Sequence, residues 1–440
     1  MKIAYIAAGA AGMYCGSCLH DNTLAAALIR QGHDVALIPT YTPIRTDETD
    51  VSMDRVFYGA INVYLQHSLE LFQYTPKFLH RLLDQPRLLN WIGKLGASTD
   101  ARELGPLTLS VLQGGQGRQR KELASLVEWL VDFKPDIVQL TNSMFLGFAH
   151  QIKARLNVPV LCGLVGEDLF LDQLSEPAKG KVIQELRRRA RDVDGFVAPS
   201  NFYAELMADY LGVPIARMHV IPLGIGHQDT DPSPAGDFED RPPTIGYLAR
   251  ICPEKGLHLL LEAFRLLTQS GAQPDLRLAV AGYLAERDRP YLEGLKAKTQ
   301  QWGLADRVTF LGEVDRVEKQ DFLNNIDILS VPTIHAEPKG LFALEAMAHG
   351  VPVVQPRHGS FPEMLEATGG GILVEPHSAT ALVEGLTTLL DDDEHRIRLG
   401  REGRGSVLDD FSDEKMAELT ADLYESIVQR FDPIVEGTPA

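Results

Sequence analysis

The feature that most constrains the fold is a repeated alternation of short apolar runs with helical patterns. Such alternation is typical of parallel sheets covered by helices on both faces. The sequence therefore predicts an α/β protein with two doubly wound domains, because the alternation occurs in two series. The predicted strands are 2–8, 35–39, 136–140, 158–164, 195–199 and 218–223 in the first series, and 244–249, 276–281, 308–311, 327–332, 351–355 and 371–374 in the second.

A polar stretch without apolar periodicity separates the two series and is predicted to be a linker, at residues 226–243. We expect an N-terminal domain at 1–225 and a C-terminal domain at 244–411. A last helical pattern at 412–440 has no strand after it, so this helix could pack back on the N-terminal domain. Two domains also suit a chain of 440 residues, which exceeds one ordinary core.

Residues 42–120 do not follow the alternation and are too long for a single connection. They are rich in leucine and aromatic residues with scattered basic ones, and they predict a helical insertion. Helices packed on the domain are the favoured interpretation. Contact with a membrane surface is the weaker alternative.

The composition excludes several classes of partner. The formal net charge is −18, which disfavours binding to nucleic acid and to anionic lipid. Four cysteines do not make a disulfide scaffold in a chain of this length. No apolar run approaches the roughly 20 residues that a membrane helix needs. We therefore expect a cytoplasmic protein.

Residues 337–354 combine two carboxylates with a helix start. Glu337 and Glu345 lie eight positions apart, and Gly340 begins the helix between them. Gly350 ends this helix just before an apolar strand. Unpaired amides in the first turn of a helix bind anions, so a diphosphate is expected there. The alternative is an ordinary capped helix whose glutamates complement the helix dipole.

A pair of cations follows the first strand of the second series. Arg250 and Lys255 lie where open α/β sheets bind ligands, at the carboxyl end of a strand. Two fixed cations suit a diphosphate leaving group, because they stabilise the negative charge that develops on it. The alternative is a surface arginine and a helix-start lysine without a ligand.

A glycine-containing loop at 9–16 joins the first strand to a helix predicted at about 22–31. Small residues let backbone amides approach an anion. The spacing of the glycines departs from the dinucleotide-binding fingerprint, and the loop is therefore weak support for NAD.

Taken together, these features resemble retaining glycosyltransferase family 4, whose members have the GT-B fold of two Rossmann-like domains facing across a cleft. The segment around the two glutamates is the most specific part of the resemblance, and the glycine loop is the least. The matching segments are 9–16, 194–200, 221–225, Arg250 with Lys255, and 337–354.

The resemblance implies roles for individual residues. Glu337 would hold a hydroxyl of the donor sugar, while Arg250 and Lys255 would neutralise the departing phosphate, so that no metal is required. Glu345 would accept hydrogen bonds from the ribose, and the nucleotide base would lie near Tyr283 and Val314. The implied donor-binding residues are Glu345, Gly340, Leu341, Phe342, Tyr283, Val314 and Gly12.

The acceptor side departs from the family pattern. Many members carry a histidine at the position that aligns with Val165. Glu167 or Asp168 could replace that histidine as an acceptor contact. Both could equally be acids that cap a helix.

Two further patterns leave open questions. Cys15, Cys18, Cys162 and Cys252 could form a metal or redox site, although buried hydrophobic cysteines are more common. Asp-x-Asp pairs at 192–194 and 229–231 resemble solvated turns rather than metal ligands.

The sequence thus predicts a retaining, metal-independent glycosyltransferase that uses a nucleotide diphosphate sugar and an unidentified acceptor. A nucleotide-sugar epimerase and a catalytically silent nucleotide-sugar-binding protein are the alternatives.

Overall fold

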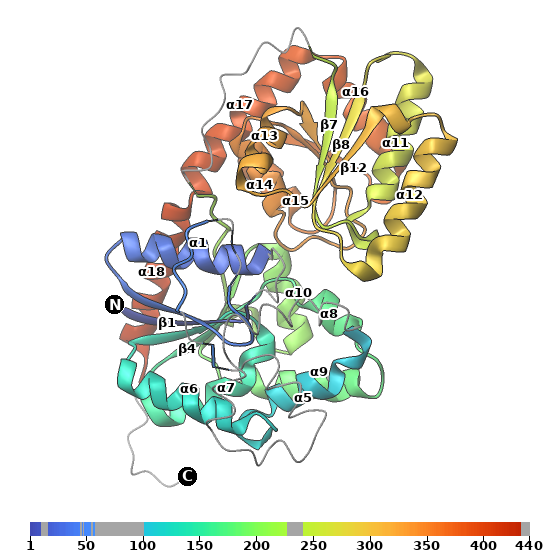
Figure 1. Cartoon of the computed structure of the whole chain (residues 1–440). Helices are drawn as coiled ribbons and strands as arrows, with labels where there is room; N and C mark the ends of the chain where they lie inside the picture. The colour runs from blue at the N-terminus through green and yellow to red at the C-terminus, as the bar shows by residue number, and fades with distance from the viewer. Residues whose placement is uncertain are drawn as a thin grey trace. The chain divides into compact units, whose positions relative to one another are not determined.

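The structure of the protein, a computed structural model, describes residues 1–9, 16–44, 46, 48–53, 56–57, 101–226 and 241–432. Gly12, Cys15, most of the predicted insertion and linker, and the Asp-x-Asp pair at 229–231 lie outside the described residues. The chain divides into two compact units (Figure 1). Unit 1 comprises residues 1–222 and 416–440, and unit 2 comprises residues 223–415.

Unit 1 is built on a six-stranded parallel sheet in the order β2-β1-β3-β4-β5-β6. All six strands lie within or next to the predicted runs, and the α/β prediction is confirmed for this half. The strands are β1 (Lys2–Ala7), β2 (Asp34–Pro39), β3 (Ile137–Leu140), β4 (Val160–Gly163), β5 (Gly195–Ala198) and β6 (Met218–Val220).

Helices cover this sheet, and one of them begins earlier than predicted. Helix α1 starts at Gly16 rather than near Asn22. The apolar pattern does not predict this first part of the helix, because the buried residues Asp21, Asn22 and Thr23 are polar. The remaining helices are α5 (Gly105–Leu112), α6 (Arg120–Phe133), α7 (Leu146–Leu156), α8 (Asp168–Asp172), α9 (Ala178–Arg189), α10 (Asn201–Leu211) and the C-terminal α18 (Asp413–Arg430), with α1 ending at Arg30.

The C-terminal helix α18 belongs largely to unit 1. Met416 and Tyr424 are buried in one hydrophobic cluster with Ile3 of β1. The Tyr424 hydroxyl donates a hydrogen bond to Gln139 Oε1 of β3 at 3.3 Å. At the start of the helix, Ser412 Oγ accepts from the Lys415 N–H at 3.2 Å and so caps it.

Unit 2 repeats the architecture with a six-stranded parallel sheet in the order β12-β11-β10-β7-β8-β9. Only β10 is clearly shorter than predicted. The strands are β7 (Thr244–Leu248), β8 (Arg277–Ala281), β9 (Val308–Gly312), β10 (Ile328–Leu329), β11 (Val353–Pro356) and β12 (Gly371–Val374). The helices are α11 (Leu257–Ser270), α12 (Arg289–Gln301), α13 (Arg316–Asn324), α14 (Leu341–Ala348), α15 (Phe361–Thr368), α16 (Ala379–Leu390) and α17 (Asp393–Asp410).

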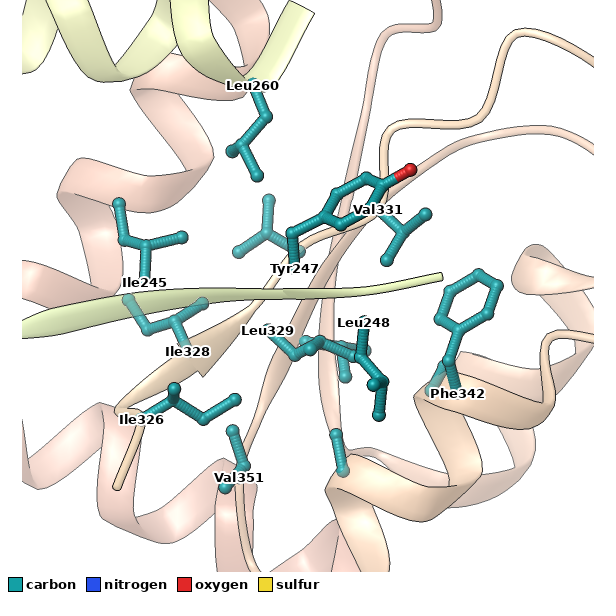
Figure 2. Packing of buried hydrophobic residues seen from close by; sticks show 14 of the residues in the cluster. Ile245, Tyr247, Leu248, Leu260, Ile326, Ile328, Leu329, Val331, Phe342 and Val351 are labelled. Atoms are coloured by element: carbon teal, nitrogen blue, oxygen red, sulfur yellow. The ribbon is translucent and has the colours of Figure 1, made fainter. Parts of the chain in front are cut away.

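The core of unit 2 lies on both faces of β7. Figure 2 shows Tyr247 on the face that carries Leu260 of α11, and Leu248 on the opposite face, toward Phe342 of α14. This alternation follows from the twofold periodicity of a strand. The strand order reverses between β7 and β10, and ligands of open α/β sheets bind beyond the carboxyl ends of strands at such a reversal. Among the described helices, none is both long enough and apolar enough to span a lipid bilayer.

Candidate functional site

Two loops meet at the carboxyl ends of β7 and β10. The loop after β7 forms a short turn, η8 (Pro253–Lys255), and the Ile334 N–H of the other loop donates to the Glu254 carbonyl at 2.8 Å. Gly256 has φ +72°, and a Cβ at this position would overlap the Pro332 carbonyl oxygen. Only glycine therefore allows the two backbones to approach this closely.

Glu337 lies at the centre of this junction and is 7% exposed. Its Oε2 forms an ion pair with Lys255 Nζ, and its Oε1 accepts from the Gly340 N–H at 3.3 Å. Burial alone would raise the pKa of Glu337, but Lys255 and the Gly340 N–H outweigh burial and lower it. The carboxylate is therefore held ionised beside a cation.

Helix α14 begins at this carboxylate. Gly340 is its N-cap residue with φ +66°, which fits the glycine predicted to open the helix. The Gly340 N–H already donates to Glu337, so the first-turn amides left for an anion are those of Leu341 and Phe342, which have no intrahelical acceptor. Lys255 Nζ lies 5.3 Å from the centroid of the Phe342 ring. The structure thus brings five predicted residues together.

Arg250 lies in the same loop as Lys255, and its backbone is fixed by neighbours. The Tyr247 hydroxyl donates to the Arg250 carbonyl at 3.1 Å. The Arg250 guanidinium donates through Nε to Cys252 Sγ at 3.3 Å. Burial would lower the pKa of Arg250, but Cys252, Glu254 and Asp288 outweigh burial and raise it. The guanidinium is therefore charged.

The residues expected near a base follow β8 and β9. The Tyr283 carbonyl accepts from the Ile251 N–H at 2.9 Å, so Tyr283 is tied to the loop that carries Arg250. Burial, together with Glu313, raises the pKa of Tyr283. Val314 follows Glu313 and packs partly buried against the core of unit 2. Tyr283 and Val314 thus follow the two strands next to β7 on one side of the sheet.

Glu345 lies on α14, one turn after Leu341. Its Oε1 forms an ion pair with Lys319 Nζ of α13 at 2.9 Å, with both side chains largely buried. Unlike Glu337, it has no hydrogen bond to Lys255, Arg250 or the first-turn amides among the described contacts. A ligand at Glu345 would therefore also meet Lys319.

The acidic pair in unit 1 has a structural task. Glu167 Oε1 accepts from the Ser143 N–H at 2.9 Å and Oε2 from the Val165 N–H at 2.7 Å. Asp168 Oδ1 accepts from the Tyr203 hydroxyl at 2.8 Å. Glu167 occupies the N-cap position of α8 without a side-chain capping bond, and Asp168 lies in the first turn of this helix. The Glu167 carboxylate joins the loops after β3 and β4.

Sequence reasoning missed a buried acid in unit 1. Asp21 of α1 accepts from the Tyr5 hydroxyl at 2.8 Å and from the Thr141 hydroxyl at 2.7 Å. His20 Nδ1 lies 3.3 Å from the same carboxylate. The polar residues from His20 to Thr23 could have indicated such a site. Because the helix was predicted to begin near Asn22, Asp21 was not expected to be a buried helix residue.

The cysteines and the described Asp-x-Asp pair have separate environments. Cys18, Cys162 and Cys252 are buried. Asp194 forms an ion pair with Lys153 at 2.7 Å and accepts from the Val160 N–H, so it fixes the start of β4. Across the described ranges, no group of three or more His, Cys, Asp or Glu residues is arranged to hold a metal ion.

Comparison with family models identifies the class of protein. Residues 22–224 match the family described as a glycosyl transferase 4-like domain, and residues 230–406 match glycosyl transferases group 1. The chain belongs to this family of glycosyltransferases, and its two matched segments follow each other along the sequence. The resemblance to glycosyltransferase family 4, for which residues 337–354 gave the most specific signal, is confirmed.

Individual relatives match part of their length. The chain is 30% identical over 264 residues to a D-inositol 3-phosphate glycosyltransferase of Xylanimonas cellulosilytica, covering 57% of this chain and 61% of that protein. It is 28% identical over 252 residues to a GDP-mannose-dependent α-(1-6)-phosphatidylinositol monomannoside mannosyltransferase of Mycobacterium tuberculosis, covering 54% and 63%. The matches therefore span less than two thirds of these relatives.

Solved structures of the same architecture extend over nearly the whole chain. Sucrose-phosphate synthase from Thermosynechococcus elongatus matches with a TM-score of 0.70 at 20% identity, covering 97% of this chain and 99% of that one. Anabaena HepE in complex with UDP matches with a TM-score of 0.67 at 18% identity, covering 97% and 100%. The TM-scores over nearly the whole chain establish the fold, which is GT-B as predicted.

Proposed function

We propose that this protein transfers a sugar from a nucleotide diphosphate sugar to an acceptor hydroxyl, with retention of the anomeric configuration and without a metal ion. The observation that carries the proposal is the junction of the loops after β7 and β10. It gathers Lys255, Glu337 and the Gly340 N–H at the start of α14 into one hydrogen-bonded group at the reversal of strand order. Such a group suits a diphosphate joined to a sugar.

The charges of the junction fit the chemistry of the leaving group. When the bond between the anomeric carbon and the phosphate oxygen breaks, the nucleoside diphosphate gains negative charge. Lys255 and Arg250 would stabilise that charge. In the reaction that the family resemblance implies, the acceptor oxygen bonds to the anomeric carbon from the same side, and the departing phosphate takes the acceptor proton.

Glu337 would hold a hydroxyl of the donor sugar. Each carboxylate oxygen can accept more than one hydrogen bond, so a sugar hydroxyl can bind without displacing Lys255 or the Gly340 N–H. Glu345 would hold the ribose, with the base near Tyr283 and Val314. On unit 1, Glu167 would support an acceptor site by fixing two loops, and Asp168 would do so by joining α8 to Tyr203 of α10.

A transfer assay tests the proposal. The protein is incubated in EDTA with UDP-glucose or GDP-mannose, with D-inositol 3-phosphate as the first acceptor, since the named relatives and structures contain or use these groups. Release of UDP or GDP and the proton NMR spectrum of the product are followed. We expect donor cleavage in EDTA and a product with the anomeric configuration of the donor. An inverted product would refute retention, and conversion to an epimer without acceptor would indicate an epimerase.

A further inference from the structure

The thiol of Cys252 lies between two charged side chains of the loop that follows β7. Arg250 Nε donates to Cys252 Sγ at 3.3 Å, and the thiol contributes to the lowered pKa of Glu254, which is raised by burial but lowered more by its polar neighbours. Cys252 is fully buried, with 0% exposure. Neither family resemblance nor the proposed reaction gives this cysteine a task.

The thiol accepts a hydrogen bond from the Arg250 side chain. Among the described residues, Cys252 Sγ is the hydrogen-bond partner of the Arg250 guanidinium. The Arg250 backbone is held separately, by the Tyr247 hydroxyl and by the bond from the Ile251 N–H to the Tyr283 carbonyl. With Nε bonded to sulfur, the two terminal NH₂ groups of the guanidinium remain for phosphate oxygens.

The environment of Cys252 argues against reactive thiol chemistry. Burial raises the pKa of the thiol, and the nearby Arg250 only partly offsets that effect. The thiolate is the nucleophilic and oxidisable form of cysteine, so a buried protonated thiol is unreactive. What remains for Cys252 is hydrogen bonding and packing.

We propose that Cys252 is a positioning residue that holds the Arg250 guanidinium toward the diphosphate of the donor and so strengthens diphosphate binding. The proposal rests on the proposed function, because it assumes that Arg250 meets a phosphate. An arginine side chain loses considerable rotamer entropy when it binds a ligand. A bond that fixes the side chain beforehand removes part of this cost.

The experiment compares Cys252→Ala and Cys252→Ser with Cys162→Ala as the matched control. Cys162 is also free and fully buried, but it lies on β4 of unit 1. The dissociation constants of UDP, GDP, uridine and guanosine are measured by calorimetry. We expect Cys252→Ala to weaken diphosphate binding about tenfold, comparable to one hydrogen bond to a charged group. Binding of the nucleoside should stay unchanged, serine should restore diphosphate binding, and Cys162→Ala should have no effect.

Other results would overturn the inference in distinguishable ways. If Arg250→Ala loses diphosphate binding while Cys252→Ala keeps it, the positioning role is wrong and the proposed function stands. If nucleoside and diphosphate affinities fall together and serine does not restore them, Cys252 is only a packing residue. If the parent protein binds neither diphosphate, the proposed function itself fails. Cys252→Val, which fills the space without accepting a hydrogen bond, replaces the alanine variant should that variant not fold.

Discussion

Replacing Lys255 by methionine is expected to destabilise unit 2 by an amount that depends on pH. Lys255 is the cation paired with Glu337, and the Glu337 side chain is only 9% exposed against 24% for Lys255. Methionine keeps much of the length of the side chain but removes its charge. The variant therefore leaves a buried carboxylate without its cation, which is the costly way to break an ion pair.

The penalty of the stranded carboxylate has an upper limit that follows from protonation, and the loss of the parent's own stabilisation adds to this penalty. A stranded carboxylate escapes by binding a proton, and at pH 7 this costs about 1.36 kcal/mol for each pH unit above the ordinary pKa of 4.5. The limit is thus about 3.4 kcal/mol at pH 7 and about 0.7 kcal/mol at pH 5. Glu337→Gln should cost less, because the Lys255 ammonium that it leaves can reach water.

The signs of the pH dependence differ between parent and variant. In the parent the pKa of Glu337 is lowered, so its stabilisation is present above pH 4.5 and is lost as the pH falls through the lowered pKa. In Lys255→Met the pKa is raised, so the penalty is absent below pH 4.5 and grows as the pH rises. The stability difference between the two proteins should therefore widen from pH 5 to pH 7.

Urea unfolding at both pH values measures this difference. Trp302 packs against the core of unit 2, and its fluorescence reports that unit alone when Trp91 and Trp129 are replaced by phenylalanine. Lys296→Met is the control, since Lys296 and Glu293 form an exposed pair worth less than about 1 kcal/mol. Equal destabilisation at pH 5 and pH 7 would refute the reasoning, because it would show that the carboxylate does not depend on Lys255.

Three further variants test single residues. Glu337→Gln should lower turnover far more than it lowers affinity for the nucleoside diphosphate, and unchanged turnover in steady-state assays would contradict its role at the donor sugar. Glu345→Gln should reduce the preference for UDP or GDP over the 2′,3′-dideoxy nucleotide about tenfold, because the ribose hydroxyls lose a charged acceptor. An unchanged ratio of the two dissociation constants in calorimetry would show that Glu345 does not bind the ribose. Glu167→Gln should destabilise unit 1 by about 1–3 kcal/mol, because two backbone N–H groups lose a charged acceptor. If urea unfolding gives unit 1 of the variant the same free energy of unfolding as the parent, these bonds contribute nothing to stability.

The sequence predicts what local periodicity controls. All twelve strands and the helix from Leu341 to Ala348 follow from apolar patterns and from the glycines that bound them. The predicted start of α1 was wrong because the first part of the helix buries polar residues, among them Asp21 and Asn22. A pattern of hydrophobicity carries no information about a polar helix face that is satisfied by hydrogen bonds.

The contacts of the site could be predicted only in part. The positions of Lys255 and Glu337 at strand ends follow from the strand order, but their pairing over 82 positions depends on how two loops approach at Gly256. The bond from Arg250 to Cys252 depends on a rotamer, and the pair of Glu345 with Lys319 depends on the packing of two helices. Such contacts are set by tertiary structure, which residue spacing alone does not determine.

A crystal structure of the protein with bound UDP or GDP would examine the proposed donor site itself. We predict that the diphosphate contacts Lys255 Nζ, the Arg250 guanidinium and the amides of Leu341 and Phe342, with the ribose at Glu345. A nucleotide bound away from the carboxyl ends of β7 and β10, with these groups left unoccupied, would contradict the proposed function.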